Sequence, residues 1–131
     1  MLSDEEKRSL SKVRLEHARD CLQDAENLLS SERYKGSANR SYYAVFHAIR
    51  AVLALDGIDR KRHSGVISEF RRLYIRTGIF DEKWSDVIGD QFDYRTFSDY
   101  SDFFTLSKKE AEEQFENAKR FLTVISEYLE K

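Results

Sequence analysis

Apolar residues recur every three or four positions along most of the chain, which is the spacing of amphipathic α-helices. Five helices are predicted, over residues 3–31, 37–55, 64–76, 81–103 and from 107 to about 129. The last segment has the clearest repeat, with steps of four and three between its apolar residues: Ala111, Phe115, Ala118, Leu122, Ile125 and Leu129. The pattern predicts an all-α protein, an antiparallel up-down helical bundle of four principal helices plus one shorter helix.

Polar residues and glycines mark the ends of these segments. Ser107 and Glu110 have the spacing of a capping box at the start of the fifth helix. Gly57 and Gly78 stand where left-handed caps would end the second and third helices. Gly89 lies inside the fourth segment, and we expect that it bends or divides that helix.

The composition fits a globular protein with one domain over residues 1–131. Hydrophobic residues make up 40% of the chain and charged residues 35%, which excludes a disordered polyelectrolyte. No apolar run reaches the ~18 residues of a membrane-spanning helix, and the first residues are too polar for a signal peptide. A single cysteine, Cys21, agrees with a reducing compartment. We therefore expect a cytoplasmic protein without a membrane segment.

The second helix carries more than a core stripe. Its apolar residues complete one face of the helix, and Arg40 and His47 lie within about 20° of each other on the opposite face. Tyr43 and Arg50 flank this pair. Three small residues keep the face shallow enough for a ligand or another subunit to come close: Ala44, Ala51 and Ala54. The face is either an ordinary exposed or subunit-contact surface, or a functional site.

The residue types on this face suit one chemistry. An imidazole with a pKa near ~6.5 exchanges protons at neutral pH, and a guanidinium holds a phosphate through two hydrogen bonds. Together they favour metal-free phosphodiester cleavage. His17 and Cys21 have the spacing of two metal ligands, but no second pair accompanies them, so no metal site is expected. No phosphate-binding glycine-rich loop is present, and no cofactor is predicted.

Charge is distributed unevenly along a chain whose net charge is only -2. Residues 60–76 hold six Lys or Arg and one acid, and the basic run includes Arg60, Lys61, Arg62 and His63. Such a run favours one local anionic contact, and the alternative is a solvated basic loop.

Three stretches resemble the HEPN superfamily, and the resemblance spans nearly the whole chain. They are "NRSYYAVFHAIRAVL", "HSGVISEFRRLYIRTG" and "DYRTFSDYSDF". The resemblance implies a helical bundle that usually forms a homodimer and is often encoded beside a minimal nucleotidyltransferase. Many members of that superfamily are toxins or metal-independent ribonucleases whose signature is Arg, four to six residues, then His. Arg40 and His47 match this spacing with six intervening residues.

One departure from the family pattern keeps two hypotheses open. In its ribonucleases the signature lies in a later helix, near Arg95, and here no histidine follows that arginine. The first hypothesis is a ribonuclease or toxin of a toxin–antitoxin-like pair, with His47 as the general acid or base and Arg40 stabilising the charged phosphorane. The alternative is a non-catalytic nucleotide- or partner-binding helical subunit of a nucleotidyltransferase. Apart from these two hypotheses, the sequence also allows a purely structural helical adaptor.

Under either hypothesis the same set of residues is expected to contact RNA or nucleotide: Tyr43, Arg50, Arg60, Lys61, Arg62, His63 and Arg95. Arg95 also has a structural interpretation, because Asp99 one turn later would form an ion pair with it. We further expect a homodimer whose interface is the alanine-lined face of the second helix.

Overall fold

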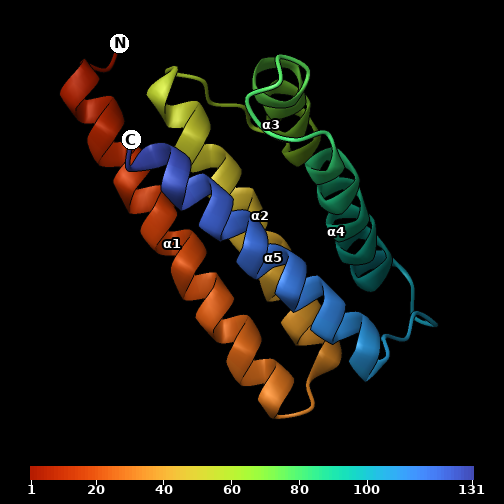
Figure 1. Cartoon of the computed structure of the whole chain (residues 1–131). Coiled ribbons are helices and arrows are strands. Elements are labelled where there is room, and N and C mark those ends of the chain that lie inside the picture. Colours follow the sequence, from red (N-terminus) through yellow and green to blue (C-terminus); the bar gives the residue numbers. More distant parts are fainter.

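The computed structural model describes all 131 residues and consists of helices joined by short loops (Figure 1). The elements in chain order are α1 (Asp4–Ser30), α2 (Tyr34–Leu55), α3 (His63–Phe70), the π-helical segment η1 (Arg71–Ile75), α4 (Lys83–Tyr100) and α5 (Lys108–Leu129). The predicted bundle of four principal helices and one shorter helix is confirmed.

The four long helices alternate in direction, and α2 is the central one. Figure 1 shows α5 lying across α2, with α1 on one side and α4 on the other. α2 contacts α1, α3, α4 and α5, so it carries the largest share of the core. Most residues of α2 are therefore buried, and its polar residues Arg40, His47 and Arg50 are only partly exposed. No helix is long and apolar enough to cross a membrane.

Local sequence signals account for several helix ends. Ser107 and Glu110 form the predicted capping box, and Ser3 with Glu6 forms a second one at the start of α1. Gly57 and Gly78 adopt positive φ angles of 69° and 84°, as expected where a helical segment ends in a left-handed residue.

Several predicted bounds differ from the structure because tertiary contacts override local signals. α2 begins at Tyr34 and not at residue 37, and Ser37 lies inside the helix, where its hydroxyl donates to the Ala25 carbonyl oxygen at 2.8 Å. The third segment is not one regular helix, because η1 follows α3. α4 occupies residues 83–100, where 81–103 was predicted. It continues through Gly89, and the missing side chain leaves room for the Arg71 guanidinium, whose Nη2 donates to the Ser85 carbonyl oxygen.

The alanine-lined face of α2 is not free, which corrects the expectation that it forms a subunit interface. Ala44 and Ala51 are fully buried, and Ala54 is 2% exposed. Ala44 and Ala51 belong to the same core cluster as Leu15 and Ala18 of α1. The apolar stripe of the 27-residue α1 requires a long partner, and α2 supplies it.

Candidate functional site

The ring of Tyr43 lies at the centre of the polar groups on α2. The Arg40 guanidinium carbon is 4.8 Å from the centre of this ring, and the His47 ring centre is 6.2 Å from it. His63, the first residue of α3, approaches the same ring edge-on at 5.8 Å. The fold therefore gathers one arginine and two histidines around one aromatic side chain.

His47 is half-buried in the seam between α1 and α2. Its ring contacts His17 of α1 at 5.9 Å, and its Nδ1 is buried without a hydrogen-bond partner. Burial lowers the pKa of His47 to about 4, and the positive charges of Arg50, His17, Arg40 and Arg14 act in the same direction. The imidazole is therefore neutral at pH 7, as a general base must be, but it is a weaker base than the unperturbed imidazole expected from the sequence.

Arg40 is held by neighbours on two helices. Its Nε and Nη2 donate to the side-chain oxygen of Asn39 at 3.3 and 3.1 Å, and its Nη1 lies 4.0 Å from the sulfur of Cys21 on α1. Burial raises the pKa of the Cys21 thiol, so this contact involves a neutral sulfur. No carboxylate pairs with Arg40, so no neighbouring negative charge compensates its positive charge.

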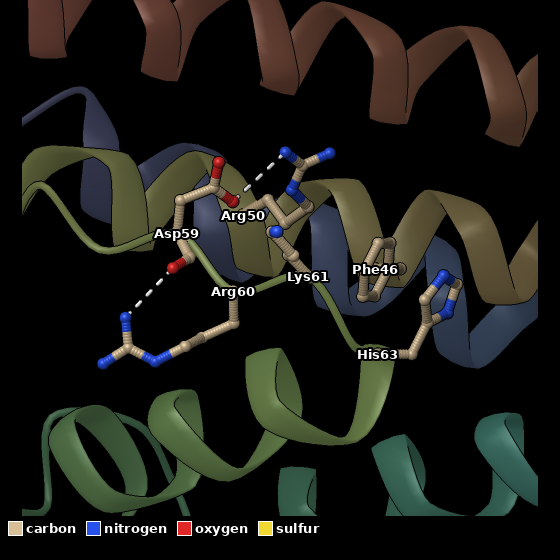
Figure 2. A pocket seen from close by; sticks show the side chains of 6 residues that line it. All are labelled: Phe46, Arg50, Asp59, Arg60, Lys61 and His63. Atoms are coloured by element: carbon tan, nitrogen blue, oxygen red, sulfur yellow. Dashed lines mark hydrogen bonds and ion pairs between the residues drawn. The ribbon is translucent and has the colours of Figure 1, made fainter.

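A basic pocket opens next to this cluster, between α2 and the loop that leads to α3 (Figure 2). It has a volume of about 490 Å³ and is lined by six residues: Phe46, Arg50, Asp59, Arg60, Lys61 and His63. Four of these were predicted from the sequence to bind RNA or nucleotide. One aromatic ring, four cationic or titratable nitrogen groups and one carboxylate make this an anion-attracting concavity.

The carboxylate of Asp59 lies between two arginines. It pairs with Arg50 at 3.4 Å and with Arg14 at 3.5 Å. Arg14 is buried and also donates to the backbone carbonyl of Arg50 at 3.2 Å, whereas Asp59 is 63% exposed. Burial, followed by the charge of Arg50, lowers the pKa of Arg14, and the Asp59 carboxylate opposes this shift. Asp59 thus occupies the position that an external anion would take on Arg50.

Three of the predicted contact residues do not line the pocket: Tyr43, Arg62 and Arg95. Arg62 is exposed at the residue preceding α3. Arg95 forms the ion pair with Asp99 that its structural interpretation required, with Nε 3.1 Å from the carboxylate oxygen. The Arg95 guanidinium also lies 5.9 Å from the ring centre of Tyr42, so it remains beside the cluster.

Sequence patterns alone missed Tyr42, Phe46, Arg14 and Asp59 as parts of this site. Tyr42 and Phe46 belong to the core stripe of α2. Helical periodicity shows which side chains face the core, but not which groups the far end of such a side chain contacts. Arg14 lies far away in sequence and reaches the site only because α1 packs on α2. The one sequence signal for Asp59 was its position as an acidic residue directly before a basic run.

Comparison with known proteins agrees with this fold. The model of the HEPN domain family matches residues 11–128. A "UPF0332 protein" of Thermotoga maritima is 32% identical over 113 residues, which cover 86% of each chain. A protein of Methanocaldococcus jannaschii named "putative toxin" is 34% identical over 123 residues, covering 94% of this chain and 83% of its own. A second protein with that name from the same organism is 30% identical over 87 residues, or 66% of this chain and 65% of its own. The chain therefore belongs to the HEPN domain family.

Proposed function

We propose that this protein binds RNA along the surface formed by Arg40, Tyr43, His47 and the basic pocket, and cleaves it without a metal ion. The observation that carries the proposal is the gathering of cationic and aromatic side chains from α2, the loop that follows it and the first residue of α3 in one place. Cationic groups bind phosphates, and aromatic rings stack on the bases of single-stranded RNA. Two relatives are named as putative toxins, which supports a toxic role. The proposed role is that of the ribonuclease in a toxin–antitoxin-like pair, and the proposed partner is a minimal nucleotidyltransferase.

The proposed reaction is transesterification at phosphorus. His47 in its neutral form takes the proton of the ribose 2′-hydroxyl, and the 2′-oxygen attacks the adjacent phosphorus. Arg40 holds the phosphate oxygens and stabilises the additional negative charge of the phosphorane. The bond to the 5′-oxygen then breaks, leaving a 2′,3′-cyclic phosphate and a 5′-hydroxyl.

Arg40→Lys tests the role of the guanidinium because it keeps the charge and removes the planar two-point contact. We expect cleavage of a single-stranded RNA in EDTA to slow by roughly 10²–10³-fold, the usual loss for one group that stabilises a developing oxyanion. Arg120→Lys on the solvated face of α5 is the matched control and should retain the wild-type rate. Equal rates in Arg40→Lys and wild-type protein would remove Arg40 from the mechanism.

A second candidate function is non-catalytic binding of a nucleotide or of a nucleotidyltransferase. The observation that favours it is the pocket itself, whose volume of about 490 Å³ falls within the range of small-ligand sites. Wild-type protein that binds RNA or a nucleotide in EDTA and releases no cyclic phosphate product would support this function over the ribonuclease.

Asp59→Asn is expected to tighten binding of a short single-stranded RNA about fivefold at low salt, because it removes roughly 1 kcal/mol of repulsion from the pocket. The amide has the size of the carboxylate and releases Arg50 from its ion pair. Fluorescence anisotropy measures the change, and Glu113→Gln on α5 gives the same change in net charge away from the pocket. An equal gain in both variants would mean that only the total charge matters.

A homodimer remains a prediction of family membership. Its interface cannot consist of Ala44, Ala51 and Ala54, since these residues are buried inside the protomer.

A further inference from the structure

A buried tyrosine directs its hydroxyl to the histidine at the edge of the basic pocket. Tyr42 is 1% exposed and belongs to the core, yet its Oη lies 2.6 Å from Nδ1 of His63. Burial raises the pKa of Tyr42, so the hydroxyl is neutral at physiological pH. A core position that would accept phenylalanine thus carries a hydroxyl whose hydrogen bond goes to a group at the surface.

The ring of His63 is fixed by stacking as well as by this hydrogen bond. It lies on Phe46, which Figure 2 also draws, with ring centres 4.0 Å apart and planes 13° apart. It is also nearly parallel to Tyr42, with ring centres 5.8 Å apart. Stacking sets the plane of the imidazole, and the hydrogen bond sets its rotation in that plane. Because Nδ1 is committed to Tyr42, Nε2 is the ring nitrogen that can meet a ligand.

His63 and His47 flank the same two aromatic rings. Phe46 lies 5.9 Å from His47 and 4.0 Å from His63, and Tyr43 lies 6.2 and 5.8 Å from them. Transesterification needs one group that removes the proton of the 2′-hydroxyl and one that protonates the leaving oxygen. The proposed function assigns the first of these to His47 and leaves the second without a residue.

We propose that His63 is the general acid of the reaction, with Tyr42 as its positioning residue, an inference that rests on the ribonuclease function proposed above. The Tyr42 oxygen accepts Nδ1–H, and Nε2–H of the imidazolium donates its proton to the 5′-oxygen as the P–O5′ bond breaks and the O2′–P bond forms. The proton lost from the 2′-hydroxyl goes to His47, so one proton enters and one leaves the substrate. Afterwards both histidines exchange protons with water and return to their starting forms.

The charges around the pocket explain why bound substrate would favour the protonated form of His63. Burial, followed by the charges of Arg95 and Arg50, lowers the pKa of His63 in the free protein. A phosphodiester bound at Arg50, Arg60 and Lys61 brings a negative charge beside the ring and favours the imidazolium. His63 then carries the proton that the leaving 5′-oxygen requires.

Substrates with different leaving groups distinguish an acid role of His63 from a structural role. A 5′-alkoxide must be protonated as it departs, whereas 4-nitrophenolate is a stable anion and departs without an acid. We expect His63→Gln to slow cleavage of a uridine-containing RNA oligonucleotide by roughly 10²–10⁴-fold, the usual contribution of a general acid. Cleavage of uridine 3′-(4-nitrophenyl phosphate) by the same variant should stay within a few-fold of the wild-type rate.

Two further variants separate positioning and folding from acid catalysis. Tyr42→Phe keeps the ring in the core and removes the hydroxyl, so it should show a smaller loss with the same preference for the activated substrate. In the His63→Gln background it should add no further loss. Arg120→Gln removes an exposed cation of α5 outside the pocket and should cleave both substrates normally. Thermal unfolding followed by circular dichroism checks each variant, and Tyr42→Phe carries the test if His63→Gln is unfolded.

The outcomes distinguish this inference from the proposed function. Wild-type protein that cleaves neither substrate overturns both proposals. Wild-type cleavage combined with a folded His63→Gln variant that matches the wild type, or that loses equally on both substrates, overturns only the acid role of His63.

Discussion

His47→Gln is expected to lower the rate of RNA cleavage in EDTA by roughly 10²–10⁴-fold, the contribution of a positioned proton-transfer group. The expectation rests on the neutral imidazole at pH 7 and on the contacts that this ring shares with Tyr43 and Phe46. Unlike the loss in His63→Gln, this loss should be as large with uridine 3′-(4-nitrophenyl phosphate), because the 2′-hydroxyl must be deprotonated whatever the leaving group is.

The glutamine variant is a suitable probe because it keeps a polar side chain of similar length in the seam between α1 and α2. Single-turnover rates with both substrates, measured on variants whose unfolding temperatures match the wild type, give the result. Wild-type rates in His47→Gln would show that the Arg and His spacing in α2 has no catalytic role, and the non-catalytic function would then be favoured.

Acidification is expected to destabilise the protein through the same histidine. The pKa of His47 is about 4 in the folded protein, whereas an unfolded chain has the ordinary value near ~6.5. Between these values the unfolded state binds more protons, so the free energy of unfolding decreases as the pH falls. The stability contributed by His47 is therefore complete above pH ~6.5 and is lost by pH ~4.

The size of this effect is on the order of 1–2 kcal/mol, because partial exposure screens the repulsion between His47 and the surrounding arginines. Urea unfolding of wild-type and His47→Gln protein at pH 7 and pH 4.5 isolates it, since carboxylates titrate similarly in both proteins. The wild type should lose more stability than the variant. Parallel losses would contradict the low pKa, while a residual slope in the variant is expected from His63, whose pKa burial also lowers.

The sequence predicted the bundle well because each helix carries its own apolar stripe and end signals. The repeat from Ala111 to Leu129 and the capping box at Ser107 lie within one segment, so no knowledge of its neighbours was needed. α3 was less predictable, since the continuation into η1 depends on how Tyr74 and Ile75 fit into a core built by other helices.

The candidate site was predictable only in part, for the same reason. The sequence shows Arg40, His47 and the basic run at residues 60–63 as candidates for phosphate binding or proton transfer. The predicted surroundings of these residues were wrong at one point, because a helical wheel gives the direction of a side chain and not what covers it. Ala44, between Arg40 and His47, is buried in the same core cluster as Leu15 and Ala18 of α1, so this face became an intramolecular seam with polar groups along its edge.

The sequence by itself determined the helical class, the family resemblance and the presence of an arginine and a histidine at a meaningful spacing on α2. These properties follow from local periodicity, which 3.6 residues per turn converts directly into shared faces. Only the tertiary structure decided that His63 is held by Tyr42 and that Asp59 lies between Arg14 and Arg50. Those contacts join residues from different helices and loops, and their distances are set by how the helices pack, which no local pattern in the chain encodes.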